Sequence, residues 1–409
     1  MVGRRAELDK GPIEAEDLLH LVALFFAMMA SGGNFIVRRE IWVALLILVC
    51  LYLLRWRVPI SATRQYLYLW IMIVMVIVAV TQGTGGLLST GSRLMTFVAS
   101  LLLLEVYTQR SVDRVQQDMS IILRIMAIQA ILTVIVANLF NNYFWTVNVS
   151  DQDYYTLGYI FNYHFVLDEV RRIRPDGFFY EPGVYQIYMS ILLYLSLFWR
   201  FNLLWALIAT VALIALWSTI GLLVTAILFV LAFKIIMARL RGAFRIMVIG
   251  GYVLLFSAVI YLGVSNYEEK TTGSLEGSSI ARMYDYYTGL NIVAQHPFTG
   301  IGFNVDTYLA YSKAFASTLT DLPDNAVGTR PSTNGILQVF YTIGIPLGLS
   351  LLLGIFRQRL FSNRLAMITI LIGGFAGQAL VFTPFFLAIL YTGLLKARRA
   401  QRITGVRAA

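Results

Sequence analysis

Two polar stretches of the chain carry side chains that suit chemistry on phosphate groups. The first stretch, RRIRPDGFFYEPGVYQ, contains Arg171, Arg172 and Arg174, and it places Glu181 directly before Pro182. The planar guanidinium of arginine can bind two phosphate oxygens at once, and a carboxylate can remove the proton of a hydroxyl group. Proline suits the first turn of a helix, so Glu181 is predicted to lie at a helix N-terminus, where the local potential favours anions.

A structural role is the alternative for these arginines. Asp168, Glu169 and Asp176 lie among them, and the three acidic residues nearly cancel the three arginines in an ion-pair cluster. The segment is also rich in aromatic residues, which favour headgroup depth in a membrane and also stack on sugar rings. The sequence alone leaves both alternatives open.

The second stretch, SIARMYDYYTGLNIVAQHPFTGIG, covers residues 279–302. It is predicted to form a short helix over residues 280–295, because a His-Pro pair follows and the residue before proline disfavours helix. Four residues at helical spacing are expected to share one face of it: Arg282, Asp285, Tyr286 and Gly289. Arg282 then either faces a substrate or pairs with Asp285.

Further polar candidates follow this helix. His296 either caps the helix or acts as a second candidate base beside Glu181. The Gly-Ile-Gly sequence at 300–302 is too short for a phosphate-binding loop and predicts a tight turn. The later sequence RPSTNGILQ brings Arg330 and Asn334 to the start of an apolar run, with Gln338 one turn inside it.

The composition favours neither metal nor nucleotide chemistry. The chain has 3 histidines, scattered along its length, and 1 cysteine, a set that does not favour a zinc site. No P-loop or dinucleotide fingerprint follows a strand. The net charge of +10 comes from arginines in short loops beside apolar runs, which indicates membrane anchoring rather than nucleic-acid binding. The sequence therefore predicts a site without metal or cofactor.

The rest of the chain is apolar enough to place these stretches at a membrane surface. Of its 409 residues, 58% are hydrophobic and only 13% are charged, against about 25% charged residues in soluble domains. Apolar runs near the roughly 20 residues that cross a bilayer predict spans at 17–35, 40–54, 65–82, 93–108, 118–140, 184–199, 202–217, 219–238, 244–264, 335–356, 364–380 and 382–396. We therefore expect an all-α polytopic membrane protein with about 12 transmembrane helices in a single membrane domain over residues 1–409.

Positively charged loops predict the orientation. Arginine and lysine clusters recur in alternate loops, and the positive-inside rule assigns that side, with both termini, to the cytoplasm. Two long hydrophilic segments then lie together on the outer face: residues 141–183 as the first outer loop, and residues 265–334, with short helices, as the second. Arg38 and Arg39 break the charge pattern, although Glu40 partly offsets them.

Three sequence blocks resemble one family. In order, RPDGFFYEPG, ARMYDYYTGLNIVAQHPFTGIGF and STNGILQVFYTIGIPLG are similar to motifs of the O-antigen polymerase/O-antigen ligase superfamily, which includes the Wzy-type polysaccharide polymerases. The resemblance implies a GT-C-like, metal-independent glycosyltransferase of the bacterial inner (cytoplasmic) membrane, with its active site facing the periplasm. The implied substrates are undecaprenyl-diphosphate-linked oligosaccharide repeats of O-antigen or exopolysaccharide.

The resemblance also assigns roles to residues. The family arginine of the first outer loop falls on Arg174 and that of the second on Arg282, with Glu181 in the Glu-Pro element. Arg172 and Gly183 fit the arginine–ten residues–glycine spacing of polymerases. The candidate catalytic residues are therefore Arg174, Glu181, Arg282 and His296, and the candidate substrate-binding residues are Arg172, Arg330, Asn334, Tyr286 and Tyr180.

One departure from the family pattern favours a polymerase. Ligases of the superfamily have a His-Asn pair before the span that follows the second loop, and this chain has Thr333-Asn334 there. A ligase that moves polymer to lipid A core remains an alternative, as does a lipid-linked oligosaccharide flippase. A flippase would place charges inside the spans, where only Arg124 and Lys234 are found. The expected partners are the lipid-linked glycan donor and acceptor, membrane lipids and a chain-length regulator, with no nucleic acid.

Overall fold

The computed structural model describes residues 15–32, 34–55, 64–82, 87–149, 152–166, 172–239, 242–272, 276–316 and 332–395. Arg171 and Arg330, which the sequence analysis singled out, lie outside these ranges, so their roles stay predictions.

Helices make up most of the structure. They are α1 (Ala15–Met29), α2 (Arg39–Leu53), α3 (Gln65–Gln82), α4 (Leu87–Gln109), α5 (Val112–Leu139), α6 (Pro182–Tyr194), α7 (Leu203–Ala215), α8 (Thr219–Arg239), α9 (Gly242–Thr272), α10 (Glu276–Gln295), α11 (Val305–Ala316), α12 (Gly335–Arg357), α13 (Arg364–Gly377) and α14 (Pro384–Leu394). A π-helical turn, Leu195–Trp199, extends α6. Each predicted span overlaps one helix, and α10 confirms the helix predicted over residues 280–295.

The helices fit a membrane protein. Among the described residues, α5, α8 and α12 are each long and apolar enough to cross a bilayer, and several shorter helices are apolar as well. The expected number of about 12 crossings stays a prediction. Arg64, Arg110 and Arg359, which the charge pattern placed on one side, line one cavity of about 440 Å³.

The first polar segment contains an antiparallel sheet, which the expected all-α fold did not include. Its strands are β1 (Trp145–Val149), β2 (Gln152–Leu157), β3 (Phe161–Val166) and β4 (Arg172–Pro175), paired in that order. The strands are rich in tyrosine, phenylalanine, valine and threonine, which favour a pleated surface. Cross-strand partners Tyr155 and Tyr163 stack with ring centroids 5.2 Å apart.

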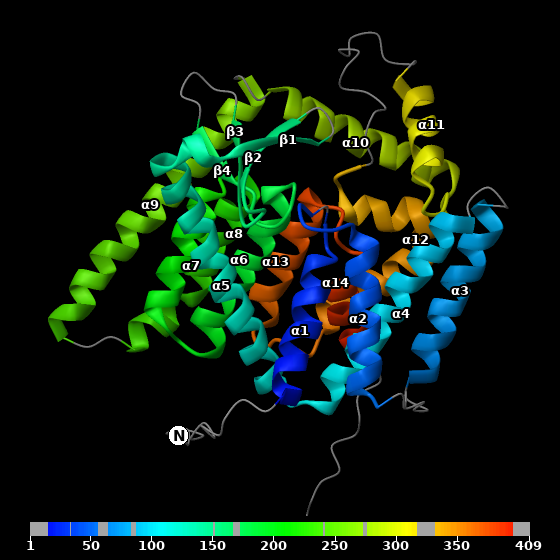
Figure 1. The fold of residues 1–409 in the computed structure, drawn as a ribbon, viewed down its shortest axis with the longest axis horizontal. Helices are drawn as coiled ribbons and strands as arrows, with labels where there is room; N and C mark the ends of the chain where they lie inside the picture. The colour runs from blue at the N-terminus through cyan, green and yellow to red at the C-terminus, as the bar shows by residue number, and fades with distance from the viewer. Residues whose placement is uncertain are drawn as a thin grey trace, which may run out of the picture.

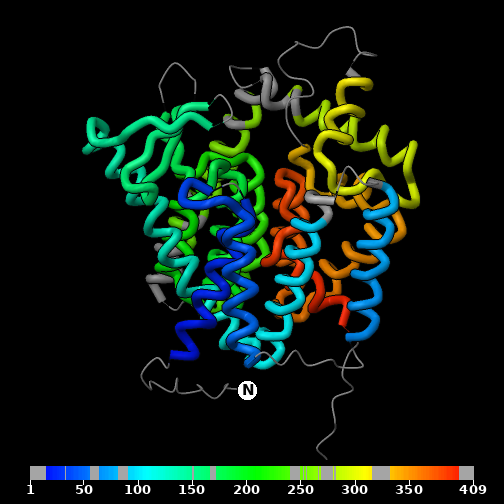
Figure 2. The backbone as a smooth tube through the Cα atoms, turned by 45° about the vertical axis from the view of Figure 1, so that its right-hand side comes forward, coloured from blue at the N-terminus to red at the C-terminus, as the bar shows by residue number. Residues whose placement is uncertain are grey.

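The sheet and the helices of the second polar segment lie at the same end of the bundle. Figure 1 shows β1–β4, α10 and α11 together at the top, and the view in Figure 2 agrees. We call this the sheet end. Polar groups from segments far apart in the sequence are therefore gathered on one side of the bundle.

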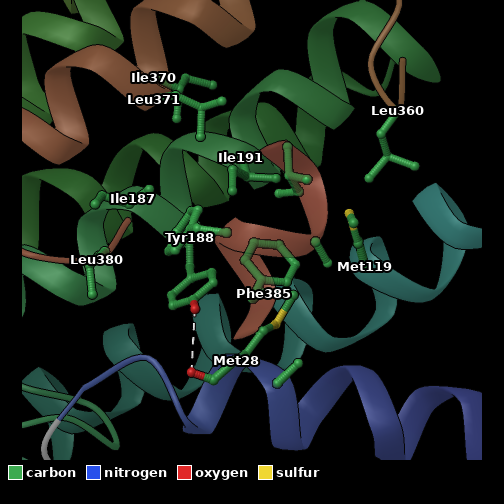
Figure 3. Close-up of a cluster of buried hydrophobic side chains, with 14 of the residues drawn as sticks. Met28, Met119, Ile187, Tyr188, Ile191, Leu360, Ile370, Leu371, Leu380 and Phe385 are labelled. Atoms are coloured by element: carbon green, nitrogen blue, oxygen red, sulfur yellow. Dashed lines mark hydrogen bonds between the residues drawn. The ribbon is translucent and has the colours of Figure 1, made fainter. Parts of the chain in front are cut away.

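Helices α6 and α14 form the centre of the bundle. All of α6, and α14 as far as Gly393, is buried within the protein. Figure 3 shows Tyr188 of α6 packed among apolar side chains that include Phe385 of α14, with its hydroxyl group donating to the carbonyl of Met28 (3.3 Å). Close packing and such hydrogen bonds hold helices together where a membrane weakens the hydrophobic effect. The same hydroxyl also bonds Ser31, so this core fixes the link between α1 and α2 at the sheet end.

Candidate active site

A cavity of about 290 Å³ lies at the sheet end of the bundle. Its wall comes from six parts of the chain: the α1–α2 link and the start of α2 (Ser31, Gly32, Arg39), α4 (Arg93), the start of α6 (Tyr180, Glu181, Val184), residues before and in α11 (Gly302–Val305, Tyr308), the first half of α12 with Ser332 before it (Gln338, Tyr341, Thr342), and the α13–α14 link (Gln378–Leu380). Two of the candidate residues, Tyr180 and Glu181, belong to it.

A break in α12 shapes one side of the cavity. Gly344 has φ 77° and ψ 167°, which interrupts the helix. The carbonyls of Tyr341 and Thr342 instead accept hydrogen bonds from the backbone N–H groups of Ile301 (2.7 Å) and Gly302 (3.0 Å). The turn predicted at residues 300–302 is thus docked on the broken helix, an irregularity that membrane helices tolerate where it lines a cavity.

The start of α6 brings Glu181 to the cavity. Glu181 is the N-cap residue, and its exposed side chain forms no capping hydrogen bond, so it is available to a substrate. Tyr180 packs edge-on against Phe35, with ring centroids 4.7 Å apart. A Cβ atom on Gly183 would lie 2.1 Å from the side-chain nitrogen of Gln378, a cavity residue. The glycine of the arginine–ten residues–glycine spacing therefore allows α6 to approach the α13–α14 link.

The two arginines of β4 contact the turn between α7 and α8. The Nε–H of Arg174 donates to the carbonyl of Leu216 (2.9 Å). The guanidinium of Arg172 lies 3.9 Å from the ring centroid of Trp217, a cation–π contact. Neither arginine is part of the cavity wall. These contacts hold the sheet against the bundle beside Glu181.

Arg174 nevertheless interacts electrostatically with the other candidates. Burial lowers the pKa of its guanidinium, Asp176 raises it, Arg282 lowers it and Glu181 raises it. Arginine stays protonated in proteins. These effects therefore indicate that the charged groups lie close enough to act on Arg174, and not that its protonation changes. Glu181 and Arg282, two of the other three candidate catalytic residues, are therefore within electrostatic range of Arg174.

The four candidate positions on one side of α10 differ in exposure. Arg282 and Tyr286 are exposed, whereas Asp285 is buried and Gly289 packs against Leu337 of α12. The four positions share one side of the helix, as expected, but α11 and α12 cover the part of that side that bears Asp285 and Gly289. Arg282 and Tyr286 can thus meet a substrate from solvent.

His296 and Asn334 have structural contacts. The Nε2 atom of His296 lies 2.5 Å from the hydroxyl oxygen of Tyr311 in α11, so this histidine ties the end of α10 to α11. The side-chain oxygen of Asn334 accepts from the N–H of Leu337 and caps α12. Neither residue lines the cavity.

Sequence reasoning did not find two arginines of the cavity wall. Arg39, the first residue of α2, donates through Nη2 to the carbonyl of Phe382 (3.0 Å). Arg93 of α4 lies over the ring of Phe303, 5.3 Å from its centroid. The available signals were that Arg39 breaks the charge pattern of the loops and that Arg93 begins a predicted span. Arg93 is not among the charges expected inside the spans, which are Arg124 and Lys234.

Metal ligands are not gathered in the described ranges, where no three His, Cys, Asp or Glu side chains come together. His164 and Asp176 bond each other at 2.8 Å beneath the sheet. Burial raises the pKa of Asp176 to about 6. The absence of a metal from the reaction stays a prediction.

Comparison with known proteins identifies part of the chain. Residues 203–352 match the family described as O-antigen ligase (Wzy_C). No curated protein and no solved structure matches. The match covers α7 to most of α12, with Arg282 and Thr333, and leaves Arg174 and Glu181 outside. It confirms the resemblance to the O-antigen polymerase/O-antigen ligase superfamily.

Proposed function

We propose that this membrane protein, whose residues 203–352 match the O-antigen ligase family, is a glycosyltransferase that polymerises oligosaccharide repeats. Its donor is a growing glycan on undecaprenyl diphosphate, and its acceptor is the terminal sugar of a new lipid-linked repeat. The sheet end faces the periplasm of a bacterium, with the bundle in the inner membrane. The segments 141–183 and 265–334 are its two outer loops, within a single membrane domain.

The observation that carries this proposal is the position of Glu181. It lies on the cavity wall, exposed and without a capping bond, and within electrostatic range of Arg174. A carboxylate beside several guanidinium groups suits a reaction in which a hydroxyl group loses a proton while a diphosphate leaves.

The proposed step transfers the donor glycan from its diphosphate to the acceptor hydroxyl. Glu181 accepts the proton of the acceptor hydroxyl, and the acceptor oxygen bonds to C1 of the donor sugar. The bond between C1 and the diphosphate oxygen breaks, and undecaprenyl diphosphate leaves with the bonding electrons. Arg174 and Arg282 stabilise the negative charge that develops, with Arg172 and Arg330 as further cations, and each well-placed donor contributes roughly 3–4 kcal/mol to such a transition state.

Thr333 supports a polymerase over a ligase. The position at which superfamily ligases have histidine is threonine here, and its backbone and hydroxyl groups donate to the buried carboxylate of Asp285. The side chain is thus engaged in a structural contact and has no basic nitrogen. Transfer of finished polymer to lipid A core is the second candidate, because the matched family is described as O-antigen ligase.

The test is polymer synthesis by the purified protein in lipid vesicles with undecaprenyl-diphosphate-linked repeats. The wild type is expected to produce a glycan ladder, and Glu181→Gln and Arg282→Ala to produce none at equal protein levels. Glu16→Gln is the matched control, because Glu16 is an exposed carboxylate in the first turn of α1, remote from the cavity. Full ladders from both site variants would contradict the site assignment.

Cells that lack the protein separate the candidate functions. Single-repeat glycans in such cells support a polymerase. Full-length polymer retained on the lipid carrier would instead indicate a ligase, and repeats retained on the cytoplasmic face would indicate a flippase.

A further inference from the structure

Two arginines on the cavity wall form no ion pair in the described residues, although the nearby carboxylate of Glu40 acts electrostatically on both. In the described part of the chain, no carboxylate oxygen lies within 4.0 Å of Arg39 or Arg93; the ion pairs found there involve Arg64, Arg110 and His164. Arg39 bonds only a backbone carbonyl, and Arg93 contacts an aromatic ring. Cations among membrane helices are costly without an anion and commonly mark substrate sites.

The remaining cavity wall also suits an anion. Besides the two arginines it includes one carboxylate, Glu181, and the hydroxyl groups of Tyr308 and Tyr341. The N-termini of α2 and α6 both begin at the cavity, and the positive end of a helix dipole favours negative charge. Both arginines lie outside the matched residues 203–352.

The size of the cavity limits what it can hold. Ligand pockets usually measure roughly 300–1,000 Å³, and this one measures about 290 Å³. It therefore suits a diphosphate with the sugar ring attached to it, rather than a whole oligosaccharide. The longer glycan would then extend past the exposed Tyr286 and Arg282 of α10.

The surroundings of Arg93 indicate that the anion belongs to a lipid. Leu94 and Met95, the next two residues of α4, are 44% and 43% exposed on the outside of the bundle. Met95 also lines a small cavity between α2 and α4, together with Arg39 and Glu40. A lipid chain attached to an anion at these arginines can thus continue along the apolar surface of α4 into the bilayer.

We infer that Arg39 and Arg93 bind the diphosphate of the lipid-linked donor, and that its polyprenyl chain lies along the exposed apolar surface of α4. This inference rests on the proposed function and refines it. Arg39 and Arg93 contact the leaving group inside the cavity, beside Glu181, whereas Arg174 and Arg282 lie outside the cavity wall.

The test measures binding of radiolabelled undecaprenyl diphosphate to the full-length protein in phosphatidylcholine nanodiscs. Charge-assisted hydrogen bonds are strong enough that Arg39→Gln and Arg93→Gln should each weaken binding about tenfold or more. Arg38→Gln is the matched control, since Arg38 is the exposed neighbour of Arg39 and does not line the cavity. Its dissociation constant should stay within about twofold of the wild-type value. Arg39→Lys, which keeps the charge and the stem, serves as a second variant if Arg39→Gln fails to fold.

Competition and synthesis assays distinguish the outcomes. Unlabelled undecaprenyl diphosphate should displace the probe, and tenfold more phosphatidylglycerol should not. Displacement by phosphatidylglycerol, or unchanged binding by both glutamine variants, would overturn the inference. A wild type that binds the probe through these arginines but makes no polymer would overturn only the proposed function.

Discussion

Asp285 accepts two hydrogen bonds from Thr333, one from its backbone N–H and one from its hydroxyl group, each at 3.1 Å. The hydroxyl of Tyr308 lies 3.3 Å from the same carboxylate. Asp285 is buried in α10, one turn after Arg282, and Thr333 precedes α12. This contact ties the helix that bears Arg282 to the segment that forms the cavity wall.

Replacing Thr333 with valine should therefore loosen the active site without removing a catalytic group. Hydrogen bonds to a charged partner contribute roughly 1.5–3 kcal/mol, so Thr333→Val should lower the unfolding free energy by about that amount and shorten the glycan ladder. Thermal unfolding in detergent and polymer synthesis in vesicles measure both effects. Thr299→Val is the control, since the exposed Thr299 hydroxyl bonds only the carbonyl of its neighbour Gly300. Equal behaviour of the two variants would contradict a positioning role for Thr333.

The contact between His296 and Tyr311 predicts a structural effect for both residues. His296→Ala and Tyr311→Phe each remove the same hydrogen bond, so each should cost about 1 kcal/mol of stability. The double variant should cost little more than either single one, because the two changes remove one shared interaction. A double-mutant cycle by thermal unfolding measures this, and polymer synthesis should fall only partly in all three variants. A His296→Ala protein of normal stability that makes no polymer would instead identify His296 as the base.

Local sequence signals predicted the parts of the site that depend on neighbouring residues. Pro182 fixes the start of α6 and so the position of Glu181, and the His296-Pro297 pair ends α10 where expected. The apolar runs correctly located the helices. These features need no knowledge of how distant segments pack.

The rest of the site depends on packing between distant segments. Arg39 and Arg93 belong to helices that meet only in the folded bundle, so neither residue's sequence neighbours indicate a shared cavity. The sheet is not predicted, because the aromatic residues of 141–183 suit membrane headgroups and sugar rings equally well, whereas residues such as Tyr155 and Tyr163 pair across strands. Helical spacing alone could not tell which side of α10 faces α11 and α12.

Asp176 should make stability depend on pH. Burial raises its pKa from 3.8 to about 6, although His164 and Arg174 oppose this shift and Glu181 adds to it. The folded state therefore prefers the protonated carboxyl, and the stability it contributes is complete below pH 3.8 and is lost as pH rises through about 6. At about 1.4 kcal/mol for each pH unit, the change corresponds to about 3 kcal/mol.

Comparison with Asp176→Asn isolates this effect, because asparagine imitates the neutral carboxyl at every pH. The unfolding free energy of the wild type should fall relative to Asp176→Asn between about pH 4 and pH 7. Asp153→Asn, at an exposed position of β2 in the same sheet, should follow the wild type over this range. Parallel pH profiles for wild type and Asp176→Asn would show that Asp176 does not titrate there.

The break in α12 makes Gly344 sensitive to substitution. We expect that adding one methyl group there disrupts the active site. A Cβ atom on Gly344 would lie 2.1 Å from the carbonyl oxygen of Phe298, and φ at this glycine is +77°. Gly344→Ala must therefore displace the 298–302 segment or straighten α12, and either change removes the docking of Ile301 on Tyr341 at the cavity.

We expect Gly344→Ala to lose polymer synthesis and to accumulate poorly in membranes, as measured by glycan ladders and by quantitative blotting. Gly250→Ala in α9 is the control, because no described atom beyond the chain neighbours and the adjacent helix backbone lies within 4 Å of the added methyl group. Alanine is favoured over glycine inside a helix by about 1 kcal/mol, so this variant should be at least as stable as the wild type and fully active. An active Gly344→Ala protein would mean that the broken geometry of α12 is not needed to form the cavity. If Gly344→Ala loses activity and Gly250→Ala does not, the turn at 300–302 positions the cavity wall through its backbone contacts. Side-chain substitutions in the turn leave those backbone contacts in place and would not test them.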